Sequence, residues 1–130
     1  MIYRFEKLQV WQLAHSLVLS VYRTTKSYPP SERFDLTAQI RRAAAAIPTN
    51  LSEGGARGHR REYLQFCFIA RGSGAELRYL LRLSFDLGYI SSAEFDTLNE
   101  HLENVMRMLN GLIRSLRRNQ HANGSAVSKP

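Results

Sequence analysis

The sequence predicts an all-α protein, an antiparallel up-down-up-down four-helix bundle with a kinked second helix. Three observations lead to this fold class. Apolar residues recur at spacings of three and four along most of the chain, which is the period of an amphipathic helix. Segments rich in proline or glycine divide this pattern into four parts, and none of the parts alternates with the period of a strand. Long helices joined by short connections pack as antiparallel neighbours.

The first predicted helix covers about residues 5–27 and has a wide apolar face. Two adjacent stripes form this face, namely Leu8, Trp11, Ala14, Val18 and Val21, and Val10, Leu13, Leu17 and Tyr22. Pro29 and Pro30 end the helix, because proline lacks an amide hydrogen and disfavours helix in the residue before it. We expect the next helix to begin near Ser31 or Asp35.

The second predicted helix covers about residues 31–53 and contains a proline. Its apolar residues keep the helical spacing and comprise Leu36, Ile40, Ala43, Ala44, Ile47 and Leu51. Pro48 removes one backbone hydrogen bond, so it predicts a kink, with two shorter helices as the alternative. The glycines of the segment 54–58 end the helix, since glycine readily adopts the left-handed conformation found there.

The last two predicted helices cover residues 59–87 and about 91–118. The third has a heptad-like seam of Tyr63, Phe66, Ala70, Ser73, Leu77, Leu80, Ser84 and Leu87. Ser91 and Glu94 form a capping box at the start of the fourth. Its apolar stripe contains Phe95, Leu98, Leu102, Val105, Leu109, Leu112 and Leu116. The polar, aperiodic residues 119–130 predict a disordered tail, so we assign the bundle domain to residues 1–118.

Composition excludes several classes of protein. The N-terminus has no apolar signal region, and no apolar run approaches the roughly 18 residues of a membrane span, so we expect a cytoplasmic protein without a membrane partner. Cys67 is the only cysteine and lies between two phenylalanines, which predicts a buried thiol and excludes a cysteine-rich zinc site. The Glu-x-x-His pairs of di-iron bundles are absent. The sequence therefore predicts no enzyme, no metal and no cofactor.

Charge is strongly basic and unevenly distributed. Eighteen Lys and Arg residues face eleven Asp and Glu residues, a net charge of +7, and fifteen of the cations are arginine. The predicted topology gathers eight cations at one end of the bundle: Arg4, Lys7, Arg57, Arg60, Arg61, Arg114, Arg117 and Arg118. Only Glu6, Glu53 and Glu62 offset them there. A focused basic end attracts polyanions, although the arginines near the end of the last helix would also complement that helix's dipole.

Several motifs occur in order and carry a resemblance. They are Phe5-Glu6-Lys7-Leu8-Gln9-Val10-Trp11, Gln39-Ile40-Arg41-Arg42-Ala43-Ala44, Ile47-Pro48, Asn50, Glu53-Gly54, Arg57, Glu62-Tyr63-Leu64-Gln65-Phe66, Ile69-Ala70-Arg71-Gly72-Ser73 and Glu76-Leu77. Together they cover about residues 5–116 and resemble the four-helix-bundle proteins encoded in intervening sequences of bacterial 23S ribosomal RNA. The resemblance implies a homopentamer. It also implies distant kinship with the accessory protein of diversity-generating retroelements, which binds nucleic acid and its reverse transcriptase.

One group of motif residues has a structural interpretation of its own. The group comprises Arg42, Pro48, Asn50, Glu53, Gly54 and Arg57. A carboxylate flanked by arginines suits a charge-assisted pair. We interpret the group as a lock of the fold or of a subunit interface, with a ligand site as the alternative.

The functional hypothesis is an oligomeric, noncatalytic protein that binds RNA or DNA through a basic patch. The candidate residues are Arg41, Arg42, Arg57, His59, Arg60, Arg61, Arg117 and Arg118. Arg60 and Arg61 fall in the first turn of a helix, where the positive end of the dipole disfavours cations and an arginine cluster favours an anion site. Phosphate contacts of this kind supply affinity without sequence information. The alternative is a protein-protein interaction scaffold without affinity for nucleic acid.

Overall fold

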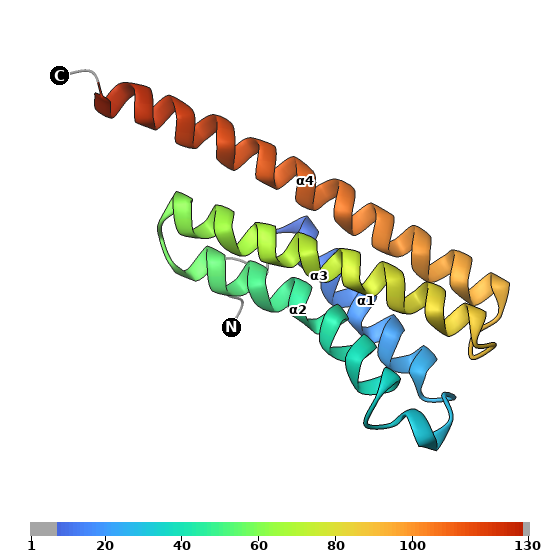
Figure 1. Cartoon of the computed structure of the whole chain (residues 1–130). Coiled ribbons are helices and arrows are strands. Elements are labelled where there is room, and N and C mark those ends of the chain that lie inside the picture. Colours follow the sequence, from blue (N-terminus) through green and yellow to red (C-terminus); the bar gives the residue numbers. More distant parts are fainter. Residues whose placement is uncertain (1–7, 129–130) are drawn as a thin grey trace.

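The computed structural model describes the backbone of residues 8–128 and the side chains of residues 8–118. It contains α1 (Gln9–Thr25), the short 3-10 helix η2 (Pro30–Glu32), α2 (Leu36–Ala56), α3 (Arg60–Asp86) and α4 (Ser92–Ser128). Successive helices run antiparallel (Figure 1). Both α1 and α3 pack against α2 and α4, whereas the backbones of the diagonal pairs lie farther apart. The predicted all-α four-helix bundle is confirmed.

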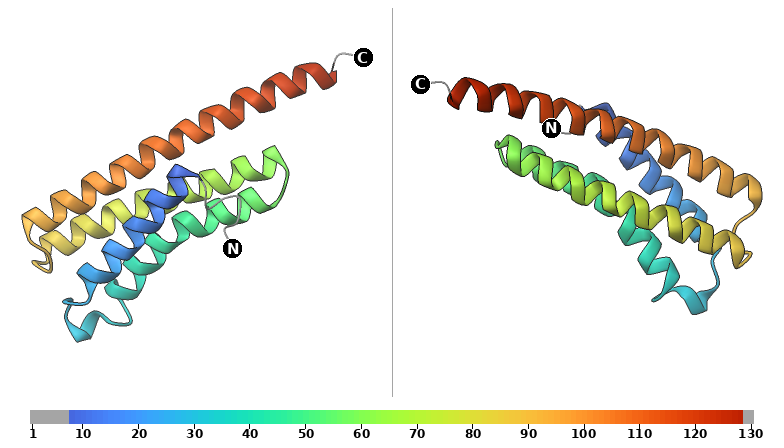
Figure 2. Two further views of the ribbon diagram at one scale, coloured as in Figure 1. Left: turned by 180° about the vertical axis from the view of Figure 1, so that it is seen from behind. Right: turned by 45° about the horizontal axis from the view of Figure 1, so that its top comes forward.

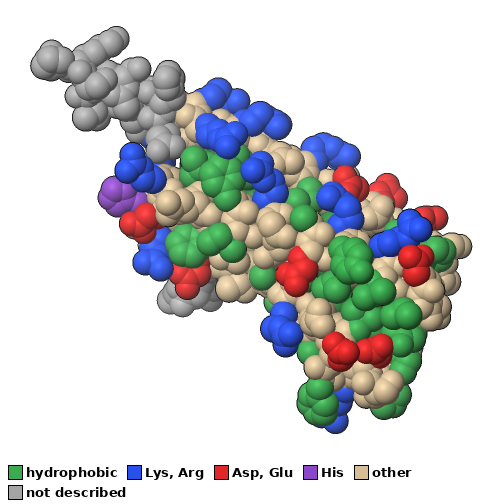
Figure 3. Space-filling model, in the orientation of Figure 1, with side chains coloured by type: hydrophobic (Ala, Val, Ile, Leu, Met, Phe, Trp, Pro, Cys, Tyr) green, Lys and Arg blue, Asp and Glu red, His purple; other side chains and the backbone are tan. Residues whose placement is uncertain are grey.

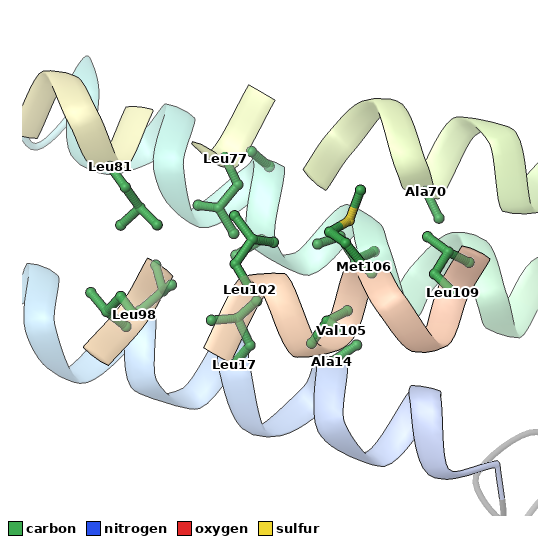
Figure 4. Close-up of a cluster of buried hydrophobic side chains, with 14 of the residues drawn as sticks. Ala14, Leu17, Ala70, Leu77, Leu81, Leu98, Leu102, Val105, Met106 and Leu109 are labelled. Atoms are coloured by element: carbon green, nitrogen blue, oxygen red, sulfur yellow. The ribbon is translucent and has the colours of Figure 1, made fainter. Parts of the chain in front are cut away.

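The core runs along the axis of the bundle and is almost entirely aliphatic. Figure 4 shows side chains of α1, α3 and α4 converging there, namely Ala14, Leu17, Ala70, Leu77, Leu81, Leu98, Leu102, Val105, Met106 and Leu109. The second helix contributes Leu36, Ile40, Ala43, Ala44, Ile47 and Leu51, all of them buried as predicted. Small residues on α2 allow its neighbours to approach closely, and the Leu and Ile side chains fill the remaining space.

The buried face of α3 is shifted from the predicted seam. The buried residues are Leu64, Cys67, Ala70, Gly74, Leu77, Leu80, Leu81 and Ser84. Tyr63 and Phe66 are only partly buried and Leu87 is half exposed, so this part of the prediction is wrong. The two aromatic residues lie on the flank of α3 that faces α2, where Gly54 leaves room for them.

Pro48 lies inside a single continuous α2, so the alternative of two shorter helices is wrong. The ribbon of α2 changes direction along its length, as the two further views in Figure 2 also show. One turn after the proline, the Ser52 hydroxyl donates to the Pro48 carbonyl at 2.8 Å and accepts from Trp11 Nε1 at 2.9 Å. This chain of hydrogen bonds ties α1 to α2 beside the kink. Gly58, with φ of +72°, makes the turn that follows α2.

The fourth helix begins as predicted and continues further than predicted. Its helical backbone extends to Ser128, past the expected end near Arg118, and its last turns run beyond the α2–α3 loop (Figure 1). Residues 119–128 contain no proline, and the single Gly124 costs only about 1 kcal/mol relative to alanine, so nothing in this segment breaks a helix. The division between a domain at 1–118 and a separate tail stays a prediction.

The capping box at the start of α4 is confirmed and can be tested. The Ser91 amide donates to Glu94 Oε1 at 2.9 Å, and the Glu94 amide donates to Ser91 Oγ at 3.1 Å. We expect Ser91→Ala to lower the free energy of unfolding by about 1 kcal/mol, because it leaves a helix-end amide without its acceptor. Ser92→Ala is the matched control and should change stability much less. Urea unfolding measures both, and equal effects would contradict a capping role.

Candidate nucleic-acid interface

The loop between α2 and α3 holds its first arginine firmly. Arg57 lies 3.2 Å from the carboxylate of Glu53 and 3.9 Å from that of Glu62. Its guanidinium also lies 5.2 Å from the centre of the Phe66 ring, which is within cation–π range. Two carboxylates thus offset the charge of Arg57. This geometry favours the interpretation of Glu53 and Arg57 as a lock between α2 and α3 over a ligand site.

The other members of the motif group do not join this cluster. The Asn50 side-chain amide donates to the Ala46 carbonyl at 2.7 Å, within α2 itself. Arg42 is exposed and makes no ion pair with any of the residues that the structure describes. Gly54 does contribute, because it allows α2 and α3 to meet closely. Only Glu53, Gly54 and Arg57 of the predicted group therefore lie together, at the corner where α2 meets α3. The other members of the group have local roles.

Arg41 lies away from the basic end. Its Nε donates to Thr25 Oγ1 at 2.9 Å, and its guanidinium lies 4.6 Å from the centre of the Tyr22 ring. Arg41 therefore binds the C-terminal turn of α1, a position where a cation stabilises the helix. Arg57 follows sixteen positions later, just after the end of α2, which places it about 24 Å away at the helical rise of 1.5 Å per residue. The structure does not bring Arg41 or its neighbour Arg42 to the candidate patch.

The remaining candidates do lie at one end of the bundle. Arg60 and Arg61 form the first turn of α3 as predicted, and His59 precedes them in the loop. Arg117 and Arg118 are exposed on α4, whose later turns run along this same end of α3 (Figure 1). Arg4 and Lys7, which the charge argument included, lie outside the described residues.

A ring flanked by two arginines joins α3 to α4, and the sequence analysis missed it. The guanidiniums of Arg71 and Arg117 each lie 5.0 Å from the centre of the Phe68 ring. Arg71 also donates to Asn110 Oδ1 at 3.3 Å. Neither arginine forms an ion pair with a carboxylate within residues 8–118. The separation of Phe68 and Arg71 by three residues on one helix was a usable signal, but the partner on α4 depends on the register of two helices.

Farther along α3 the arginines are paired. Arg78 forms an ion pair with Glu103 of α4, and Arg82 forms one with Asp86.

Unpaired arginines lie together on one flank of α4. Asn110 and Arg114 stand one turn apart on this helix, and Arg117 follows Arg114 after three residues, so these side chains share the flank. We call Arg71, Arg114, Arg117 and Arg118 the α3–α4 arginine face. Blue side chains surround a hydrophobic patch on the upper left of Figure 3, toward the end of α4.

Other groups give no sign of catalytic chemistry in the described part of the chain. Residues 8–118 contain no cluster of His, Cys, Asp or Glu able to hold a metal ion. His15 is exposed and stacks on Trp11 with ring centres 5.2 Å apart, and His101 contacts the Leu13 carbonyl at 3.2 Å. The thiol of Cys67 is fully buried as predicted, and this burial raises its pKa to about 12. A thiol with so high a pKa is a poor nucleophile.

None of the helices within residues 8–128 is long and apolar enough to cross a lipid bilayer. This result concerns helical spans in that part of the chain.

Comparisons with known proteins agree with the fold. A solved structure of a protein of unknown function from the S23 ribosomal protein family of Bacteroides thetaiotaomicron superposes with a TM-score of 0.74. It is 20% identical, and the match covers 80% of this chain and 97% of the other, so this likeness shows the fold alone. No curated protein matches the chain significantly. The family model described as 23S rRNA-intervening sequence protein matches residues 6–111, and the chain therefore belongs to that family.

Proposed function

We propose that the protein is a noncatalytic cytoplasmic oligomer that binds nucleic acid through phosphate contacts of the α3–α4 arginine face. One observation carries the proposal. Arg71 and Arg117 form no ion pair with a described carboxylate, whereas Arg57, Arg78 and Arg82 all do. Unpaired arginines on one flank of a basic protein provide a concentrated positive potential. The exposed Arg61 extends this potential toward the α2–α3 loop, where His59 is also exposed.

Self-association as a homopentamer is the second part of the proposal. The family resemblance favours five subunits, and the outer face of α3 offers an apolar surface for contact. Ile69 is 53% exposed and Tyr79 is 63% exposed on that face. Gly72 lies between them, and a Cβ there would meet nothing within 4 Å. Light scattering after gel filtration should give five times the subunit mass of 14.9 kDa, and a monomer would contradict this part.

Nucleic-acid binding is tested by fluorescence anisotropy of nuclease-treated protein with labelled RNA and DNA over a range of salt concentrations. We expect binding at low salt with a steep loss of affinity as salt rises, because phosphate contacts release counterions. The variant Arg114→Gln/Arg117→Gln/Arg118→Gln should lower affinity for all sequences alike. The slope of log K against log salt should fall by about 0.9 for each phosphate contact removed.

The matched control removes three charges elsewhere, in Arg23→Gln/Arg78→Gln/Arg82→Gln. This variant should retain most of the affinity, since Arg78 and Arg82 are paired with carboxylates. An equal loss in both triple variants would assign binding to net charge instead of to the α3–α4 arginine face. Absence of binding by the unmodified protein even at low salt would overturn the proposal in favour of a protein-interaction scaffold.

A further inference from the structure

Phe68 is the centre of a small site built by two helices. Its ring is partly buried on α3, and the guanidiniums of Arg71 and Arg117 each lie 5.0 Å from the ring centre. Asn110 of α4 accepts a hydrogen bond from Arg71 and so fixes the direction of that guanidinium. Aromatic and cationic groups therefore meet at the surface in a defined arrangement, before any ligand is present.

No carboxylate among residues 8–118 forms an ion pair with the two arginines of this site. Two guanidiniums on one ring repel each other, and the neutral Asn110 does nothing to cancel their charge. The contact between Arg57 and Phe66 provides an internal comparison, because there Glu53 and Glu62 offset the cation. A ligand anion between Arg71 and Arg117 would supply the compensation that carboxylates supply at Arg57. The geometry thus favours a phosphate group in this position.

The ring and the guanidiniums also suit the base of a nucleotide, in addition to its phosphate. Unpaired bases stack on arginine guanidinium planes as well as on aromatic rings, and in the Phe68 site the ring supports two guanidiniums, of Arg71 and Arg117. Bases in a duplex already stack on their neighbours and are not available to a ring on a helix surface. Phosphate contacts alone would favour a duplex, because its charge density is higher than that of a single strand. The ring with its two guanidiniums is therefore the element that can reverse this preference.

We propose that Phe68, Arg71 and Arg117 form a binding site for single-stranded nucleic acid, in which the arginines hold a phosphate and an unpaired base stacks within the site. This inference rests on the proposed function and adds the class of ligand. Arg114, one turn before Arg117 on α4, continues the path of the phosphate backbone. The protein then prefers single-stranded RNA or DNA to a duplex of the same length.

The first test replaces the ring and keeps an apolar side chain beneath the arginines. Phe68→Leu should weaken binding of a labelled 12-nucleotide single strand about 10-fold, the loss expected for one stacked base. Affinity for a duplex should change less than about twofold, since duplex binding would use phosphate contacts alone. Phe66→Leu makes the same change at the ring beside the compensated Arg57 and should leave both affinities unaltered. Circular dichroism and thermal melting verify that each variant is folded.

The second test keeps the charges and removes the planar groups. Arg71→Lys/Arg117→Lys should retain duplex affinity and lose the preference for single strands, because an ammonium group offers no plane for stacking. A single strand containing 2-aminopurine gives a direct signal. Its fluorescence should be quenched on binding to the unmodified protein and much less on binding to Phe68→Leu.

The outcomes separate this inference from the proposed function. Nucleic-acid binding with equal losses for single strand and duplex in Phe68→Leu would overturn the stacking site and leave phosphate binding intact. No binding by the unmodified protein would overturn both. A change of oligomeric mass in Phe68→Leu, measured by light scattering, would identify the ring as a subunit contact and overturn the inference as well.

Discussion

Raising the pH from 9 to 12 is expected to lower the free energy of unfolding by about 3 kcal/mol through Cys67 alone. Burial raises the pKa of this thiol from its ordinary 9.0 to about 12 in the folded protein. In the unfolded chain the thiol ionises first, at its ordinary pKa, and ionisation therefore favours unfolding. The stabilisation is complete below pH 9 and is lost progressively as the pH rises toward 12. Burial also raises the pKa of Tyr63 to about 12, which adds to the trend.

Urea unfolding at pH 8 and at pH 11 measures this effect. Cys67→Ala is the control for the thiol, and its stability should fall less between the two pH values, even though the variant is less stable at both. A thiol reagent at pH 8 should react slowly with the folded protein and rapidly once urea unfolds it. The same pH dependence in Cys67→Ala as in the unmodified protein would contradict the role of the buried thiol.

The second large effect is expected at the closest approach of α2 to α3. A Cβ at Gly54 would lie 2.8 Å from Phe66 Cβ and 3.3 Å from the backbone Cα of Tyr63. Neither atom can move without a shift of α3. We therefore expect Gly54→Ala to lower the free energy of unfolding by about 1–3 kcal/mol, the usual cost of overpacking, despite the better helix propensity of alanine.

Gly111→Ala on α4 is the matched control. A Cβ at Gly111 would meet only the flexible end of the Arg114 side chain, at 3.8 Å, so the same substitution should raise stability by up to about 1 kcal/mol through helix propensity. Thermal and urea unfolding of the two variants should thus move in opposite directions. A stabilising Gly54→Ala would show that α2 and α3 are not in close contact at this corner.

The buried residues of α2 and α4, which are mostly aliphatic, were the most predictable from the sequence. All six apolar residues expected to be buried on α2 are buried, and the alternation of threes and fours on α4 identified most of its core. On α3 the aromatic residues misled the prediction. Tyr63 and Phe66 have the right spacing for a seam, but their bulk lies on the α2 flank, where Gly54 provides space. When large aromatic side chains border a helix face, the spacing of apolar residues locates the buried face along the sequence only to within about one residue.

The candidate site was only half predictable because charge does not reveal position. Arg41 lies in α2 and Arg57 directly follows that helix. In the structure, however, Arg41 binds the end of α1, whereas Arg57 pairs with Glu53 and Glu62. The Phe68 site requires Arg117 to face α3, and this depends on the register of α3 against α4. Register follows from the packing of the whole core and not from any local motif. The uncompensated arginines could therefore be recognised only once the helices were placed.

The hydrogen bond from Trp11 to Ser52 places an optical probe at the junction of α1 and α2. Trp11 is the only tryptophan in the chain, so fluorescence excited selectively at the indole band comes from this one residue. The Phe68 site is formed by α3 and α4, and α3 lies diagonally across the bundle from α1. Emission excited at the indole band should thus report unfolding while staying constant when nucleic acid binds. The protein carries its own optical reference for folding, separate from the signal of any labelled ligand.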